Sequence, residues 1–253
     1  KKTVEYAKSI LKKISRPNLM IKIPGTARGF ECVRELTALG INVNVTLLFS
    51  PRQYLDAALS YMDGLKERLK RDMPVYNVNS VASMFVSRID TKIDAILGEK
   101  LKKREFSLRK DLIKSLIGTV AVSNSKIIYQ EFKKLFFSES FNKLKSNGAK
   151  MQRSLWASTG TKNPSYSDVK YIEELIGEHT VNTMPHNTLK AFLEHGKVRS
   201  SIEINKDAAK ESLSVLETLG IELEGILNVL QAEGIEAFQK SFDSMIESIK
   251  RKS

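Results

Sequence analysis

Cysteine and histidine are scarce in this chain, and their scarcity excludes several kinds of protein. The 253 residues contain one cysteine, Cys32, and three histidines. A single cysteine cannot form an internal disulfide and is typical of a reducing compartment, so we expect a cytoplasmic protein. Cys32 falls in an amphipathic helical pattern, which favours an inert packed thiol over a nucleophile. Without an HExxH motif or a Cys/His cluster, we expect no metal site.

Long apolar runs are also lacking. No uninterrupted run approaches the roughly 20 residues of a membrane-spanning helix, and the first residues show no signal-peptide pattern. Neither a GxGxxG nor a Walker A pattern occurs, so no nucleotide cofactor is indicated and we expect no cofactor at all. The chain does contain 42% hydrophobic residues. That content is enough to bury one sizeable core.

Positive charge is in excess, with a formal net charge of +12. Such an excess is compatible with nucleic acid, a membrane surface or phosphorylated small molecules as partners. The basic residues are mostly interleaved with Asp and Glu, and the densest cluster, at 100–104, has no nucleic-acid-binding motif beside it. We interpret the charge as a solvated surface that also attracts anionic small molecules. Nucleic acid is a distant alternative, and no membrane partner is expected.

Short apolar segments alternate with amphipathic helical ones, a pattern typical of βα units that form a parallel sheet. Strands are predicted at 19–24, 41–48, 79–87, 154–158 and 180–183. Helices are predicted at 3–14, 27–39, 51–71, 187–195, 207–219, 223–231 and 235–250, with a short one before 176 and a helical insertion at about 90–150. Ser50-Pro51 indicates a helix start, and Gly40 indicates a helix end.

The number of predicted strands is smaller than a (β/α)₈ barrel needs, because that fold has eight. Either the sheet is smaller and open, or three strands precede Lys1. The chain begins at Lys1 without a methionine and already in a helical pattern, so we expect it to be part of a longer gene product. No repeat or linker divides it, and residues 1–253 are interpreted as one domain.

Strand alternation selects Lys22 as a chemical candidate. In 19–24, Leu19, Ile21 and Ile23 share one face of the strand, and Lys22 lies on the other. In a barrel interior, desolvation would lower the pKa of this amine. A neutral amine can attack a ketose carbonyl and form an iminium. An exposed lysine on an open strand face is the alternative that spacing alone leaves open.

Polar residues alternate with apolar ones along the next strand as well. Asn42, Asn44 and Thr46 share a face that a βαβ arrangement normally buries. Buried polar side chains need partners, either within the protein or on a ligand. Because Asn44 and Thr46 lie beside Lys22, we expect them to contact a polyhydroxylated ligand. Asn42 lies deeper in the strand, so we expect it to be structural.

Cationic and hydroxyl side chains follow the later strands. Arg88 ends the third strand and could hold a phosphate group, although an ion pair with Asp90 is an alternative. Ser158 closes the fourth strand, and Lys162 follows in the loop. No predicted strand carries Asp or Glu, yet Schiff-base aldol chemistry needs an acid–base group. We therefore expect the missing carboxylates to lie upstream of Lys1.

Several ordered motifs closely resemble the transaldolase family, in its long bacterial form. They are NLMIKIPGT at 18–26, GINVNVTLLFS at 40–50, SVASMFVSRID at 80–90, LWASTGTKNP at 155–164 and YIEELIGEHTVNTMP at 171–185. The resemblance spans essentially the whole chain. It implies a (β/α)₈ TIM barrel of which this chain covers strands four to eight, with the helical insertion at about 90–150.

The resemblance also implies an activity. Transaldolases move a dihydroxyacetone unit from sedoheptulose 7-phosphate or fructose 6-phosphate to an aldose phosphate, without a cofactor, in the pentose phosphate pathway. The family's residues fall on positions of this chain as follows: the Schiff-base lysine on Lys22, donor contacts on Asn44 and Thr46, and the sixth-strand serine and phosphate arginine on Ser83 and Arg88. The seventh-strand phosphate-site serine falls on Ser158.

This chain departs from the family pattern at two points. Gly160 stands where the better-known short members have an arginine, so Lys162 is a candidate replacement. The family's acid–base aspartate and glutamate, on strands one and three, have no counterpart after Lys1.

Other readings stay open. An aldolase that uses the same lysine but releases free dihydroxyacetone is one alternative, and a non-catalytic fragment is another. The apolar residues of the C-terminal helices could complete the outer layer or form a dimer contact, so a monomer and a homodimer are both expected possibilities.

Overall fold

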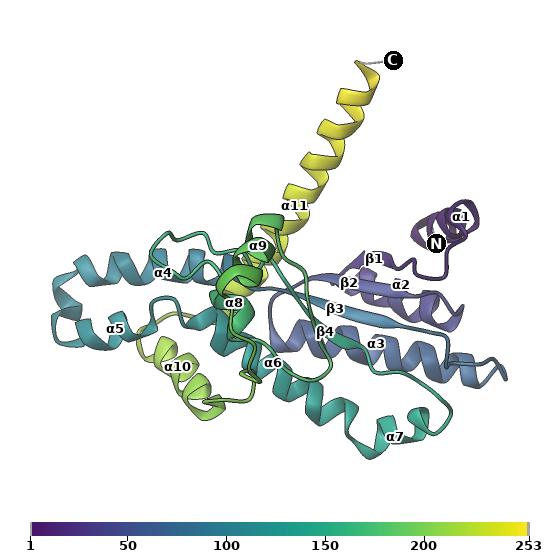
Figure 1. The fold of residues 1–253 in the computed structure, drawn as a ribbon, viewed down its shortest axis with the longest axis horizontal. Coiled ribbons are helices and arrows are strands. Elements are labelled where there is room, and N and C mark those ends of the chain that lie inside the picture. The colour runs from purple at the N-terminus through teal and green to yellow at the C-terminus, as the bar shows by residue number, and fades with distance from the viewer. Residues whose placement is uncertain (1, 252–253) are drawn as a thin grey trace.

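Five parallel strands form one sheet in the computed structural model, which describes residues 2–251 (Figure 1). The strands are β1 (Ile21–Pro24), β2 (Val43–Leu48), β3 (Ser80–Phe85), β4 (Arg153–Ala157) and β5 (Thr180–Asn182). The helices before the insertion are α1 (Lys2–Ile14), α2 (Ala27–Ala38) and α3 (Pro51–Leu69). Those of the insertion are α4 (Ser87–Lys102), the 3₁₀ helix η1 (Arg104–Arg109), α5 (Lys110–Leu116), α6 (Val120–Phe136) and α7 (Glu139–Lys145). The remaining helices are α8 (Lys170–Glu173), α9 (His186–His195), α10 (Lys206–Thr218) and α11 (Leu223–Lys250).

Each strand pairs in parallel with the next strand along the chain, in the order β1-β2-β3-β4-β5. Helical segments connect them, as parallel pairing requires. The predicted α/β class and all five predicted strands are confirmed, with ends that differ by no more than two residues. Within residues 2–251, β1 and β5 each pair with a single neighbour, so they are the two edges of the sheet.

Helices α2 and α3 cover one face of β1 to β3. The apolar residues of that face are fully or almost fully buried: Ile21, Ile23, Val43, Val45 and Ala82. Helix α3 begins as predicted, with a capping box between Ser50 and Gln53 and a proline at its first position. Through these contacts, α2 and α3 support β1 to β3 and fix the positions of the side chains on the opposite face of the sheet.

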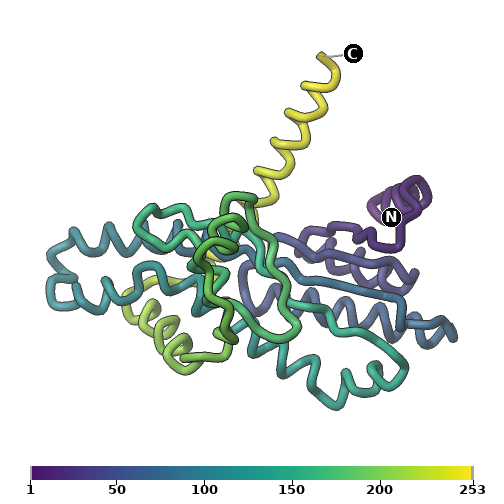
Figure 2. Tube along the Cα trace, viewed as in Figure 1, coloured from purple at the N-terminus to yellow at the C-terminus, as the bar shows by residue number. Residues whose placement is uncertain are grey.

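The helical insertion begins earlier than the predicted position near residue 90. Helix α4 starts at Ser87, so only Val86 separates it from β3. The chain from α4 through α5 reaches away from the sheet, and α6 returns to it (Figure 2). Helix α6 then packs against α3 and α4. The short junction places Arg88 in the first turn of α4, at the carboxyl end of β3.

The C-terminal helix is longer than predicted, because α11 runs without interruption from Leu223 to Lys250. The prediction of two helices, separated near Gly234, was wrong. A glycine inside a helix costs only about 1 kcal/mol, which packing can offset. A Cβ atom at Gly234 would lie 2.9 Å from Leu47 Cδ2, so glycine allows α11 to approach β2 closely. The last turns of α11 extend away from the rest of the chain (Figure 1).

The apolar residues of the C-terminal segments are partly in the core, as the outer-layer interpretation expects. The buried members are Leu216, Leu219, Ile221, Leu227 and Leu230. Of the helices in residues 2–251, none combines the length and the apolarity needed to cross a membrane.

A buried carboxyl group fixes α4 against its neighbours. Asp90 is 1% exposed; its Oδ1 accepts a hydrogen bond from the Ala121 N–H at 2.7 Å, and its Oδ2 accepts one from the Tyr171 hydroxyl at 2.8 Å. Burial raises the pKa of Asp90 from 3.8 to about 6, against the opposing effect of the two hydrogen bonds. Asp90 therefore joins α4 to α6 and α8, and it holds the helix that carries Arg88.

The raised pKa of Asp90 makes stability depend on pH. The folded state binds a proton more readily than the unfolded chain, so the stabilisation is complete below the unfolded pKa of 3.8 and is lost as pH rises through about 6. The loss corresponds to about 3 kcal/mol. Asp90→Asn removes this titration and keeps an oxygen acceptor for the Ala121 N–H. We expect the variant to gain free energy of unfolding relative to the wild type across this window.

Urea unfolding of the full-length protein at several pH values between about 4 and about 7 measures this difference. Asp63→Asn is the control, because Asp63 is exposed and paired with Lys66. Parallel pH curves for Asp90→Asn and the wild type would contradict the expectation.

Candidate active site

The polar residues of β1 and β2 share the face of the sheet opposite α2 and α3. Lys22 pairs in register with Asn44, and Pro24 pairs with Thr46. The apolar residues between them, Ile23 and Val45, point to the covered face and are 2% and 0% exposed. The structure therefore brings Lys22, Asn44 and Thr46 together on one face of β1 and β2.

Ser83 joins this group from β3. Its hydroxyl donates a hydrogen bond of 2.7 Å to the Asn44 Oδ1. With its oxygen occupied, the Asn44 amide has its NH₂ group left as a donor. Ser83 thus orients Asn44, a role that sequence alternation could not reveal because it depends on the register of β2 and β3.

Asn42 and Thr46 differ in how their polar groups are satisfied. Asn42 Oδ1 accepts from the Asn79 N–H at 2.8 Å, and its amide nitrogen approaches the Pro17 carbonyl at 3.5 Å. It therefore has the structural contacts predicted for it. Thr46 is 4% exposed, and its hydroxyl has no hydrogen-bond partner among residues 2–251. A buried hydroxyl without a partner costs about 1–3 kcal/mol.

Lys22 is exposed, whereas the barrel-interior interpretation expected a desolvated amine. Because β1 is an edge of the sheet, only β2 flanks the lysine. Its Nζ lies 5.3 Å from the centre of the Phe238 ring, on α11. Among the described residues, no carboxylate lies within 4.0 Å of the Nζ. In residues 2–251, Lys22 therefore has the environment that the alternative interpretation expected, an exposed strand face.

Arg88 lies near this face, at the start of α4. Its guanidinium carbon is 5.5 Å from the centre of the Phe85 ring. The alternative of an ion pair with Asp90 is wrong, because Asp90 is bound to Ala121 and Tyr171 instead. Arg88 forms no ion pair with any carboxylate of residues 2–251, so its charge is available to an anion.

A pair of hydroxyl groups lies at the carboxyl ends of β3 and β4. The Oγ atoms of Ser87 and Ser158 are 3.0 Å apart, and the Ser87 N–H donates to the Ser158 carbonyl. Ser158 has a positive φ of 56°, which turns the chain at the end of β4. Lys162 is exposed in the loop beyond, and within residues 2–251 no hydrogen bond or ion pair joins it to the other candidates. The structure thus brings Ser158 beside Ser87, the residue before Arg88, and leaves Lys162 apart.

Sequence reasoning missed three residues of this region. Phe238 contacts Lys22, and Gln231 hydrogen-bonds to the backbone at the ends of β1 and β2. Ser87 contacts Ser158. Ser87 could have been found as the neighbour of Arg88. Phe238 and Gln231 had no local signal, because both are more than 180 residues from the strands they contact.

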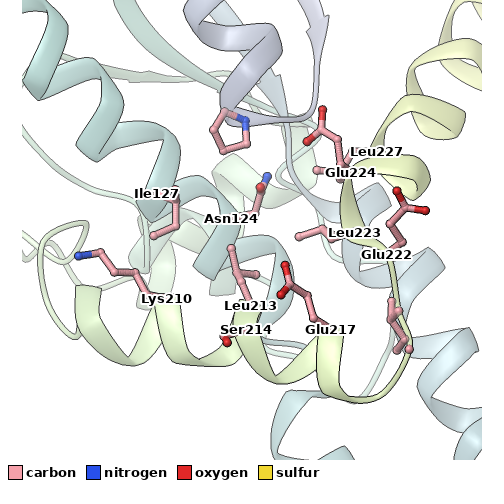
Figure 3. A pocket seen from close by; sticks show the side chains of 13 residues that line it. Asn124, Ile127, Lys210, Leu213, Ser214, Glu217, Glu222, Leu223, Glu224 and Leu227 are labelled. Carbon is pink, nitrogen blue, oxygen red and sulfur yellow. The ribbon is translucent and has the colours of Figure 1, made fainter.

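A cavity of about 880 Å³ lies elsewhere, between α6, α10, the start of α11 and the start of α3 (Figure 3). Its lining combines apolar side chains such as Leu213 and Leu223 with three carboxylates and one amine, those of Glu217, Glu222, Glu224 and Lys210. None of the predicted site residues contributes to it. Three carboxylates disfavour a phosphorylated ligand, so this cavity does not compete with the face of Lys22 as a site for an anion.

Comparison with known proteins gives a consistent result. A family model described as transaldolase/fructose-6-phosphate aldolase matches residues 1–249. A transaldolase from Trichodesmium erythraeum is 45% identical over 241 residues, which cover 94% of this chain and 63% of that protein. A transaldolase 2 from Nostoc sp. strain PCC 7120 is 41% identical over 99% of this chain and 66% of its own length. A transaldolase from Mycolicibacterium smegmatis is 40% identical over 98% of this chain and 65% of its own length.

The chain thus spans a little less than two thirds of the length of these relatives. The alignments with these relatives cover nearly all residues of this chain. The motifs around Lys22, Asn44 and Arg88 lie within the residues that the family model matches. The chain belongs to the transaldolase/fructose-6-phosphate aldolase family.

Proposed function

We propose that this chain carries the Schiff-base lysine and the donor-binding face of a transaldolase. The reaction transfers a dihydroxyacetone unit from sedoheptulose 7-phosphate or fructose 6-phosphate to an aldose phosphate. The observation that carries the proposal is the register of β1 and β2, which aligns Lys22 with Asn44 on one face. The family match to proteins named transaldolase supports the same activity.

Lys22 is the proposed nucleophile. Its neutral amine attacks the C2 carbonyl of the ketose, and the resulting carbinolamine loses water to give an iminium. The iminium withdraws electrons, so the C3–C4 bond breaks as a proton leaves the C4 hydroxyl. The products are a free aldose phosphate and an enamine of dihydroxyacetone on Lys22. The enamine then attacks the aldehyde carbon of the acceptor, and hydrolysis of the new iminium releases the product ketose.

Asn44, Thr46 and Ser83 are the proposed donor contacts. Asn44 has its amide NH₂ left as a donor because Ser83 occupies its oxygen. Thr46 has a buried hydroxyl without a partner, on the same face. Hydroxyl and amide groups in these positions suit a polyhydroxylated substrate, whose hydroxyls both donate and accept hydrogen bonds.

Arg88, Ser158 and Lys162 are the proposed phosphate contacts. Arg88 can hold a phosphate with two parallel hydrogen bonds, and it has no competing carboxylate in the described part of the chain. Ser158 contributes a hydroxyl beside Ser87. Lys162 lies in a flanking loop and would have to reach the phosphate from there. The net charge of +12 favours the approach of anionic substrates.

We further propose that the sheet is part of a (β/α)₈ barrel, in which β1 to β5 are strands four to eight and residues 1–253 form one domain. The family resemblance and the parallel order of the strands support this arrangement. Strands β1 to β5 carry no Asp or Glu, so Lys22 acts as nucleophile and electron sink, and another group must supply the acid–base step. A cytoplasmic location is proposed from the single cysteine.

A second candidate function is an aldolase that cleaves fructose 6-phosphate and releases free dihydroxyacetone. The description of the family model that matches residues 1–249 names this activity beside transaldolase, and both reactions begin with the same adduct on Lys22. An assay of the full-length protein with fructose 6-phosphate, with and without erythrose 4-phosphate, separates the two. Transfer that depends on the tetrose phosphate supports the transaldolase, and cleavage without an acceptor supports the aldolase.

Lys22→Arg should abolish both transfer and covalent adduct formation. A guanidinium stays charged and cannot form an imine, while it preserves the side chain's length and charge. Borohydride treatment with fructose 6-phosphate should add mass to the wild-type peptide that contains Lys22, and should add none in the variant. Because arginine keeps the positive charge and about the length of the lysine side chain, the melting temperature should not change. Lys8→Arg, on the surface of α1, is the matched control.

An adduct on another lysine would refute the assignment of Lys22. So would transfer activity that survives in Lys22→Arg.

Thr46→Val should separate binding from stability. The change keeps the shape of the side chain and removes a buried hydroxyl without a partner, so the free energy of unfolding should rise by about 1–3 kcal/mol. If the hydroxyl contacts the donor, kcat/KM for transfer should fall about 2- to 12-fold, the worth of one hydrogen bond. Urea unfolding and steady-state kinetics measure the two effects.

Thr37→Val is the matched control, because Thr37 is also buried with an unpaired hydroxyl but lies in α2, on the covered side of the sheet. It should change stability in the same direction and leave kcat/KM unaltered. Equal kinetics for both variants would exclude Thr46 as a donor contact.

A further inference from the structure

The first turns of α11 are attached to α3. The Ser50 hydroxyl donates to Glu224 Oε1 at 2.9 Å, and the Gln53 amide donates to Asn228 Oδ1 at 3.0 Å. Leu227 and Leu230, on the same stretch, are 1% and 4% exposed. The direction of α11 is therefore set before it reaches the face that carries Lys22.

Gln231 then joins α11 to the carboxyl ends of two strands. Its side-chain nitrogen donates to the Gly25 carbonyl at 2.8 Å and to the Leu47 carbonyl at 2.9 Å. Gly25 follows the last residue of β1, and Leu47 lies near the end of β2, where its φ of 60° marks an irregular backbone. One amide group thus holds α11 across the ends of the strands that carry Lys22 and Asn44.

The next turn of α11 approaches both parts of the candidate site. A Cβ atom at Gly234 would lie 2.9 Å from the Leu47 side chain and 3.7 Å from an Arg88 guanidinium nitrogen. Glu233 forms an ion pair of 2.8 Å with Lys92 on α4. Helix α11 is therefore fixed against β2 and α4 at Glu233 and Gly234.

Phe238 follows Gln231 by seven residues, which is about two helical turns, so both lie on the same side of α11. Its ring centre is 5.3 Å from the Lys22 Nζ, within the range of a cation–π contact. Phe238 is 46% exposed, so about half of its side chain is open beside its contact with Lys22. The attachments at Gln231 and Glu233 determine where this ring lies.

We propose that Phe238 covers the covalent adduct on Lys22 and so determines how much of the bound dihydroxyacetone unit is transferred and how much is released. This inference rests on the proposed function of Lys22. The face of an aromatic ring attracts a cation, and the iminium on Lys22 is a cation just as the ammonium is. The ring also occupies one side of the adduct, where it excludes water.

The two fates of the adduct differ in what reaches it. In transfer, the enamine carbon forms a bond to the acceptor aldehyde carbon, and the aldehyde oxygen takes up a proton. In release, the same enamine carbon takes up a proton, and water then adds to the iminium and expels the Lys22 amine with free dihydroxyacetone. Both fates end when water hydrolyses an iminium, so they differ in whether an acceptor aldehyde or a proton reaches the enamine carbon. Keeping proton donors, water included, away from one side of that carbon slows release without blocking transfer.

Two substitutions of Phe238 separate the cover from the cation–π contact. Phe238→Leu keeps an apolar side chain but removes the ring, and Phe238→Ala removes both. Phe242→Ala is the matched control, because Phe242 lies one turn further along α11, is 58% exposed and has no contact with Lys22. Gln231→Met removes the two hydrogen bonds that hold α11 while keeping the length of the side chain.

The experiment uses the full-length protein with fructose 6-phosphate, with and without erythrose 4-phosphate. It measures the adduct trapped by borohydride and the ratio of free dihydroxyacetone to transferred unit. Because the ring attracts the free ammonium of Lys22 as well as the iminium, the amount of trapped adduct should change little in Phe238→Leu and in Phe238→Ala. The release ratio should rise in Phe238→Ala and in Gln231→Met, and stay near the wild-type value in Phe238→Leu and Phe242→Ala.

Equal release ratios for Phe238→Ala, Phe242→Ala and the wild type would overturn this inference, and an adduct that is still trapped would leave Lys22 as the Schiff-base lysine. A wild-type protein that forms no adduct on Lys22 and transfers nothing would overturn the proposed function, and this inference with it. The two failures are therefore distinguishable in one set of measurements.

Discussion

The parallel register of β1 and β2 is the constraint on which the rest of the candidate site depends. Side chains alternate between the two faces of each strand, so pairing Lys22 with Asn44 also pairs Ile23 with Val45. The apolar set is buried under α2 and α3, and the polar set is left on the other face. A shift of one residue would reverse both sets at once, which is why burial of the apolar face specifies the polar face.

The segments that follow β3 and β4 supply the other candidate binding groups of this face, the Arg88 guanidinium and the Ser158 hydroxyl. The single residue between β3 and α4 keeps Arg88 at the strand end, and the buried Asp90 fixes α4 to α6 and α8. The turn at Ser158 adds a hydroxyl from β4. Binding groups thus come from short connections between rigid elements, as is common where ligands bind at the carboxyl ends of parallel strands.

Helix α11 relates the two groups of candidate residues to each other. Gly234 lies against Leu47 and near Arg88, and Phe238 lies over Lys22. A glycine in the middle of a helix weakens it slightly, and here it permits the close approach that brings the phenylalanine to the lysine. The helix that departs furthest from the rest of the chain is also the one that contacts both parts of the face.

The sequence by itself determined the five strands, the start of α3 at Ser50-Pro51 and the shared face of Lys22, Asn44 and Thr46, because period-two alternation and capping residues are local signals. Only the tertiary structure decided the partners: Ser83 for Asn44, Tyr171 and Ala121 rather than Arg88 for Asp90, and Phe238 for Lys22. It also made α11 continuous through Gly234 and left Lys22 exposed at a sheet edge. These features depend on contacts between segments far apart in the chain, and the local pattern of residues carries no record of such contacts.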